Sequence, residues 1–192
     1  MRISCVLAAR ELNAESADLI VFPEGVCRKE IEDAELSNLD AVIAAAVVEN
    51  GYSRGVLLHR GQNRIDYLKV ETDGRTVGTG NHQQNPVYEF GSFCIGVLIC
   101  MDIDKPDFSR TVVEKIRASS AKLKFLCVPA DMGDYWFSGD SLPFPNRFEG
   151  VHVILCNHVK THQARCKSFV TDIVGKKLVV QQDHEPIYAV LP

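Results

Sequence analysis

The chain has 192 residues, of which 46% are hydrophobic, and it carries a net charge of −4 at pH 7. This length and composition predict one globular domain over residues 1–192 with a sizeable apolar core. The acidic balance and the lack of a basic stripe argue against a nucleic-acid partner. No apolar run approaches the roughly 20 residues that span a bilayer.

The start of the chain also bears on where the protein works. Its apolar part, from Met1 to Val6, is too short for a secretory signal and has no cleavage-site pattern. We therefore expect a cytoplasmic protein with no membrane partner.

The chain holds seven cysteines, and most of them lie inside apolar runs. In a reducing compartment such thiols behave as small buried hydrophobes rather than as disulfides. No C-x-x-C pair is present, so neither a zinc site nor a dithiol redox motif is expected. The cysteines are Cys5, Cys27, Cys94, Cys100, Cys127, Cys156 and Cys166.

In the first part of the chain, strands are predicted over 3–9 and 19–22. Ser37 to Asp40 then has the pattern of a capping box, and apolar residues at helical spacing follow from Leu39 to Val47. This pattern predicts a helix that stops near Gly51, although the segment 46–48 could equally be a strand.

Further along, two hairpins are predicted, one around Gly61 and one turned by Gly91 and Ser92. A helix over 109–118 and a strand over 123–128 follow, and this strand is expected to stop at Pro129. A long loop from Asp131 to Pro145 comes next. Strands mixed with few helices favour an α+β layered fold with both sheet faces covered. The remaining strands are expected over 56–59, 65–70, 87–90, 93–99, 151–156, 166–172, 178–181 and 187–191.

Three chemically active side chains lie at or near the ends of these strands. Cys100 ends an apolar run and is followed at once by a polar loop. Glu24 ends a second run, and Lys69 lies near the end of a third strand-like segment. The carboxyl ends of strands are where open α/β sheets place their active sites. Each residue alone has a structural explanation, but their joint occurrence favours a catalytic one.

The three side chains match the needs of a cysteine nucleophile. Such a thiol needs a base or a lowered pKa, and Glu24 can accept its proton. Lys69 can stabilise the oxyanion, helped by the backbone N–H of Met101. Since the lysine charge would favour the thiolate, Cys100 is predicted to be the most reactive thiol of the chain.

The loop after Asp131 offers a weaker prediction. Tyr135 and Trp136 could form the walls of a substrate pocket, or they could plug the core under the loop. Asp131 could contact a substrate amine, although a solvated loop residue is the simpler interpretation.

The motifs V-F-P-E-G at 21–25, Y-L-K at 67–69 and G-V-L-I-C-M-D at 96–102 resemble the Glu–Lys–Cys signature of the carbon–nitrogen hydrolase (nitrilase) superfamily. The third motif is the most specific. Downstream motifs occur in the family's order, so the resemblance extends over nearly the whole chain.

This resemblance implies a shortened four-layer αββα sandwich that pairs into a homodimer or a higher homo-oligomer. It implies Glu24 as general base, Lys69 as oxyanion stabiliser and Cys100 as nucleophile, with Asp102 ordering the loop after the nucleophile. Family members often have a second glutamate between the lysine and the cysteine. Glu71 and Glu89 fall in that interval, but neither lies in a recognisable motif.

The function that the resemblance implies is a cysteine-dependent hydrolase of non-peptide carbon–nitrogen bonds. A small amide or carbamoyl substrate is favoured over a nitrile, and no metal or organic cofactor is implied. Two alternatives stay open: an acyltransferase with the same triad, and an inactive nitrilase-like domain that serves as a binding or assembly module.

Overall fold

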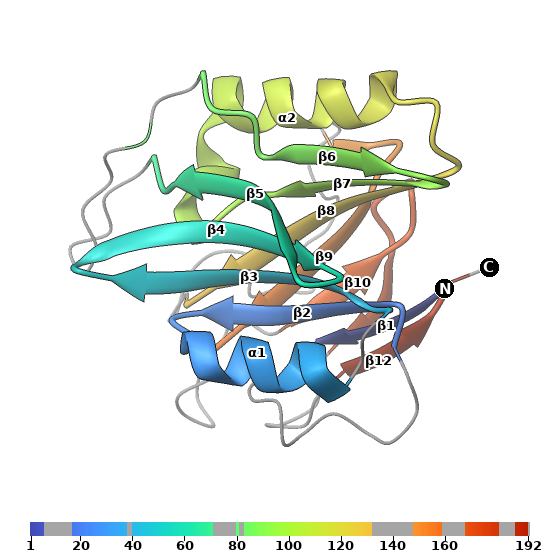
Figure 1. Cartoon of the computed structure of the whole chain (residues 1–192). Helices are drawn as coiled ribbons and strands as arrows, with labels where there is room; N and C mark the ends of the chain where they lie inside the picture. The colour runs from blue at the N-terminus through green and yellow to red at the C-terminus, as the bar shows by residue number, and fades with distance from the viewer. Residues whose placement is uncertain are drawn as a thin grey trace.

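The computed structural model describes residues 1–5, 17–37, 40–70, 80, 83–131, 148–158, 168–180 and 187–191. Within these ranges the strands form two six-stranded sheets that pack face to face. Helix α1 covers the outer face of the first sheet and helix α2 covers the outer face of the second (Figure 1). These layers form an αββα sandwich of the α+β class, as the sequence predicts.

The first sheet has the strand order β12-β1-β2-β3-β4-β5. Strands β1, β2 and β3 are parallel, while β4, β5 and β12 join antiparallel. Helix α1 (Arg28–Ser37) connects β2 to β3. The strands are β1 (Arg2–Cys5), β2 (Leu19–Glu24), β3 (Val42–Glu49), β4 (Tyr52–His59), β5 (Gln62–Leu68) and β12 (Ile187–Val190).

The second sheet has the order β11-β10-β9-β8-β7-β6, with β7, β8 and β9 parallel at its centre. The 3-10 helix η2 (Cys100–Asp104) and helix α2 (Pro106–Ala118) connect β7 to β8. The strands are β6 (Val87–Phe90), β7 (Phe93–Val97), β8 (Leu123–Ala130), β9 (His152–Asn157), β10 (Phe169–Thr171) and β11 (Lys177–Val180).

Alternate residues of the central strands face two different cores. In β2, Leu19 and Val21 lie in the core between the sheets, whereas Ile20 and Phe22 lie in the core under α1. A strand that is buried on both faces has no polar alternation, so it appears in the sequence as one continuous apolar run.

This double burial explains why the helix predicted from Leu39 to Gly51 is wrong. The segment Val42–Glu49 is strand β3, paired with β2, and the helix lies earlier, at Arg28–Ser37. A fully buried apolar run has no clear period, so helical spacing appears in it by chance. Asn50 and Gly51 both have positive φ, 53° and 81°, and form a tight turn into β4 instead of a helix stop.

A glycine in β7 allows α2 to pack closely against the second sheet. A Cβ atom on Gly96 would lie 2.7 Å from Cδ1 of Ile116 and 3.1 Å from Cγ1 of Val112. These two residues, with Phe108, form part of the buried face of α2. Gly96 therefore fixes the spacing between α2 and the strand that leads to Cys100.

Strand β8 runs through Pro129 to Ala130, two residues further than the sequence predicts. Its pairing with β7 ends at Val97 and Cys127, so Pro129 lies beyond that ladder. On its other edge β8 stays paired with β9, where Pro129 is in register with Cys156.

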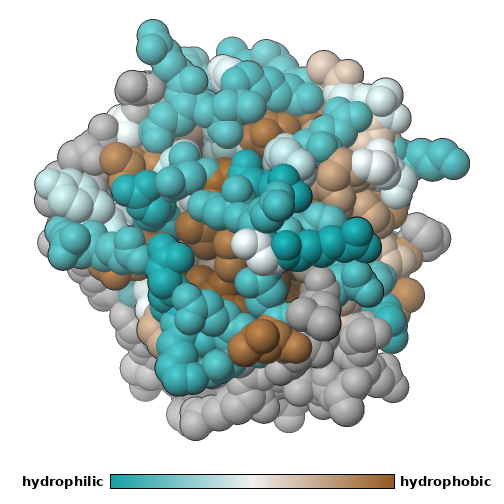
Figure 2. Space-filling view, in the orientation of Figure 1, coloured by the Kyte–Doolittle hydropathy of each residue, from teal (hydrophilic) through white to brown (hydrophobic). Residues whose placement is uncertain are grey.

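The face of the molecule seen in Figure 2 is mostly hydrophilic, with apolar residues visible in the hollows between polar ones. None of the helices in the described ranges is long and apolar enough to cross a membrane.

Candidate active site

A β-bulge directs Glu24 into the space between the sheets. Val21 pairs with Ala44 and Glu24 pairs with Ala46. Strand β2 therefore advances by three residues over a stretch in which β3 advances by two. The extra residue shifts the alternation of side chains, and Glu24 rather than Pro23 shares the inward face with Ala46. Glu24 is only 4% exposed.

Lys69 directly follows β5 and continues its inward face. Ile65, Tyr67 and Lys69 alternate along this segment, and all three are buried. The Lys69 Nζ atom donates hydrogen bonds to both oxygens of Glu24, at 2.9 Å and 3.1 Å. The lysine is fully buried, so the two residues form a desolvated ion pair.

Cys100 comes from the other sheet, at a sharp turn between β7 and η2. Its φ is +48°, in the left-handed region that non-glycine residues rarely adopt. Strain of this kind costs about 1–3 kcal/mol and is concentrated at functional sites. The turn brings the thiol into hydrogen-bonding contact with the Glu24 carboxylate and with the backbone N–H of Asp131.

Burial, which is the largest cause, and the nearby Glu24 charge together raise the pKa of the Cys100 thiol to about 12. The Lys69 charge and the Asp131 N–H act against this rise but do not cancel it. At neutral pH the thiol of the free protein is therefore protonated. This finding runs against the prediction that Cys100 is the most reactive thiol, because the thiolate is the reactive form.

The structure describes two of the other four predicted site residues, Met101 and Asp131. Met101 is the half-buried second residue of η2, and half-buried Asp131 directly follows β8. Asp131 thus joins Glu24, Lys69 and Cys100 in one cluster through its backbone N–H. The predicted pocket residues Tyr135 and Trp136 lie outside the described residues.

Of the two candidates for a second glutamate, the structure describes only Glu89, and it places this residue on the surface. Glu89 lies exposed on β6, where it accepts a hydrogen bond from the Ser120 hydroxyl at 3.2 Å. Glu71 lies outside the described part of the chain.

A buried network surrounds the cluster; it combines Asp102, which the resemblance implies as a structural residue, with Tyr67, which the sequence analysis does not single out. Both carboxylate oxygens of Asp102 accept the backbone N–H of Val70, each at 3.1 Å. The Tyr67 hydroxyl accepts the backbone N–H of Ile99 and interacts with Asp102. One feature of the sequence points to Tyr67: it lies two residues before Lys69, and residues i and i+2 of a strand share a face.

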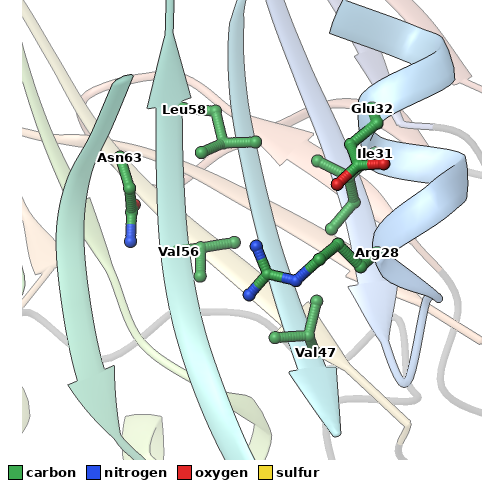
Figure 3. Close-up of a pocket in the computed structure, with 7 residues that line it drawn as sticks. All are labelled: Arg28, Ile31, Glu32, Val47, Val56, Leu58 and Asn63. Carbon is green, nitrogen blue, oxygen red and sulfur yellow. The ribbon is translucent and has the colours of Figure 1, made fainter. Parts of the chain in front are cut away.

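The structure shows a separate pocket on the outer face of the first sheet. Arg28 reaches across it from α1 toward the apolar side chains of β3 and β4 (Figure 3). The pocket lies among outward-facing residues, opposite to the face that carries Glu24, so it does not belong to the cluster. It is lined by Arg28, Ile31, Glu32, Val47, Val56, Leu58 and Asn63. Across the described ranges, no group of three or more His, Cys, Asp or Glu residues could hold a metal ion.

Two face-to-face sheets with parallel centres, each covered by a helix, form the fold of the nitrilase superfamily. The resemblance seen in the three motifs is thus confirmed at the level of the fold. No family model and no curated protein sequence matches the chain.

Solved structures identify this fold. One is Nit3 of Saccharomyces cerevisiae, a nitrilase-superfamily member, with a TM-score of 0.68, 14% identity and coverage of 98% of this chain and 89% of that chain. Another is a CN-hydrolase superfamily protein from Xanthomonas campestris, with a TM-score of 0.71, 16% identity and coverage of 98% and 89%. An amidase from Nesterenkonia sp. aligns with a TM-score of 0.67, 19% identity and coverage of 98% and 88%.

Proposed function

We propose that this protein is a cysteine-dependent hydrolase of small non-peptide amides that works through an acyl-enzyme on Cys100. The observation that carries the proposal is the buried Glu24–Lys69 ion pair in contact with the Cys100 thiol. A base, an ammonium donor and a nucleophile on three different segments, shielded from water, are the groups that acyl transfer requires.

In the first step the Cys100 sulfur attacks the amide carbon. Glu24 accepts the thiol proton, and Lys69 donates a hydrogen bond to the carbonyl oxygen as it becomes negative. The carbon–nitrogen bond then breaks. Glu24 returns the proton to the leaving nitrogen, which departs as ammonia, and a thioester remains on Cys100.

In the second step a water molecule attacks the thioester. Glu24 accepts a proton from this water and passes it to the departing sulfur, while Lys69 again stabilises the oxyanion. The products are a carboxylic acid and the regenerated thiol. Because the resting thiol is protonated, its deprotonation by Glu24 belongs to the catalytic cycle and takes place with substrate bound.

The proteins that share this fold give a reason to propose amides as substrates. One neighbour is a mutant of the Nesterenkonia amidase in complex with butyramide. A second mutant of that amidase carries the acetamide moiety of fluoroacetamide on its active-site cysteine. We therefore propose short aliphatic amides as the first compounds to test, ahead of ureido acids and nitriles.

The test is ammonia release from a panel of small amides, ureido acids and nitriles, with Cys100→Ala and Cys27→Ala compared with the wild type. Cys27 is an exposed cysteine in the turn before α1 and serves as the matched control. We expect release that disappears in Cys100→Ala and persists in Cys27→Ala. No release from any panel member would favour the binding-module alternative.

Adding hydroxylamine to the same panel of assays separates hydrolysis from acyl transfer. Hydroxylamine competes with water for a thioester, and the product is then a hydroxamate. A protein that forms product only when an added amine is present would be an acyltransferase, whereas a hydrolase forms the carboxylic acid with water alone.

We also propose that residues 1–192 form one domain that acts in the cytoplasm as a homodimer or a higher homo-oligomer. These points rest on the sequence and on the resemblance. Light scattering of the purified protein tests this assembly, and a mass that corresponds to one chain would contradict it.

A further inference from the structure

Two side chains connect the segment that carries Lys69 to the turn that carries Cys100. The Asp102 carboxylate accepts the N–H of Val70, the residue after Lys69. The Tyr67 hydroxyl accepts the N–H of Ile99, the residue before Cys100. The Tyr67 hydroxyl also donates a hydrogen bond to the Asp102 carboxylate. The two sheets are thereby joined by hydrogen bonds on either side of the site.

Tyr67 is held firmly in this position. Its ring occupies the space where Gly55 of β4 lacks a side chain, since a Cβ atom there would lie 2.3 Å from Cε1 of Tyr67. The other side of the ring meets Phe108 of α2, with 6.3 Å between ring centroids. Because the ring is fully buried between these elements, its hydroxyl has a fixed direction.

The Tyr67 hydroxyl also keeps its proton, so it can donate a hydrogen bond. Burial, together with the negative charge of Asp102, holds the pKa of Tyr67 well above its usual range. The phenol is therefore protonated at every pH at which the protein works. It can accept one hydrogen bond from Ile99 and donate one to Asp102 without competition from water.

We propose that Tyr67 and Asp102 act as one positioning unit, the Tyr67–Asp102 clamp, which holds the Lys69 ammonium and the Cys100 thiol at their reactive separation. This role rests on the proposed function, because it concerns the same reaction. Neither residue touches the reacting atoms: each acts through a backbone N–H that neighbours a catalytic side chain.

The geometry gives a reason for such a clamp. Lys69 is supplied by the first sheet and Cys100 by the second, so a small slide of one sheet over the other would separate them. Misplacement by about 1 Å can cost two orders of magnitude in rate. The left-handed φ of Cys100 is also a conformation that the surrounding contacts must enforce.

The test compares Tyr67→Phe, Asp102→Ala, Asp102→Asn and the double variant Tyr67→Phe/Asp102→Ala. The control is Tyr88→Phe, a half-buried tyrosine on β6 that loses the same hydroxyl outside the site. For the fastest amide of the panel we expect kcat to fall at least tenfold in Tyr67→Phe and Asp102→Ala, with KM changed less than threefold. Asp102→Asn keeps an oxygen acceptor and should recover part of the loss.

The double variant shows whether the two residues form one unit. If they do, it loses no more activity than the more damaged single variant. Losses that multiply, or that occur equally in Tyr88→Phe, would overturn the proposal. So would a kcat in Tyr67→Phe within twofold of the wild type.

A second measurement needs no turnover. The rate of Cys100 alkylation by iodoacetamide is followed by site-resolved mass spectrometry, with Cys27 as the internal reference. We expect Tyr67→Phe to slow alkylation of Cys100 at least fivefold at pH 8, because Lys69 no longer stabilises the thiolate, and to leave Cys27 unchanged. An equal or faster rate at Cys100 overturns the clamp. Absence of ammonia release from the wild type, by contrast, overturns only the proposed function.

Discussion

The Glu24–Lys69 ion pair, to which we assign a catalytic role, also bears on the stability of the fold. Both side chains are buried, and each is the other's hydrogen-bonding partner at about 3 Å. Taking two charges out of water is costly, and the cost is offset only while both partners remain. A variant that removes one partner therefore leaves an uncompensated charge in the interior, and its effect on folding must be separated from its effect on rate.

The first prediction concerns this pair. Lys69→Met should lower the free energy of unfolding by about 3–5 kcal/mol, because the Glu24 carboxylate is left without a partner. The double variant Glu24→Gln/Lys69→Met removes both charges and should recover at least half of that loss. Urea denaturation of the three proteins measures both values. A single variant as stable as the wild type would mean that the pair is not formed in solution.

The second prediction follows from the raised pKa of Cys100. A folded-state pKa of about 12 means that the thiolate fraction keeps increasing with pH well above neutrality. Alkylation of Cys100 should therefore rise by about tenfold per pH unit between about pH 7 and pH 10, where an ordinary thiol begins to level off near its pKa of roughly 8.5.

The same reasoning predicts the order of labelling. At pH 7.5 the exposed Cys27 should react with limiting iodoacetamide before the buried Cys100. Peptide mapping of partly labelled protein gives this order directly. If Cys100 labels first, or if its rate levels off near pH 8, then the thiol is activated in the free protein and the prediction from the sequence is restored.

At the scale of single elements, most strands are predictable from the sequence, including the doubly buried β2 and β8, whereas the doubly buried β3 is not. The hairpin of β6 and β7 lies where Gly91 and Ser92 predict it, because alternation and turn residues are local signals. The apolar run of strand β3 predicts a helix instead, since burial on both faces removes the alternation that identifies a strand and leaves a chance helical spacing. Pairing with β2 makes this segment a strand, and a short stretch of sequence does not show such pairing.

The candidate site was likewise predictable only in part. Short motifs identify Glu24, Lys69 and Cys100, of which Glu24 and Cys100 end apolar runs and Lys69 lies near the end of a strand-like segment. The bulge that turns Glu24 inward and the left-handed φ of Cys100 depend on register and packing, which a sequence does not display. Tyr67 was missed for the same reason: its hydroxyl meets Ile99 only after the two sheets have packed together.

At the scale of the whole molecule, the site exists only when the sandwich is complete. The first sheet supplies Glu24 and Lys69, and the second supplies Cys100 and the Asp131 N–H. The proposed activity therefore depends on the packing of the two sheets, so reactivity at Cys100 reports on the integrity of the fold.

The central claim is that Cys100 carries the acyl group, and a quenched-turnover measurement tests it most directly. Wild-type protein and Cys100→Ala are mixed with butyramide, stopped in acid during turnover, and analysed by intact mass followed by peptide mapping. The account predicts a butyryl adduct on the peptide that contains Cys100, and none in Cys100→Ala. Ammonia release without an adduct on Cys100, or an adduct on another residue, would contradict it.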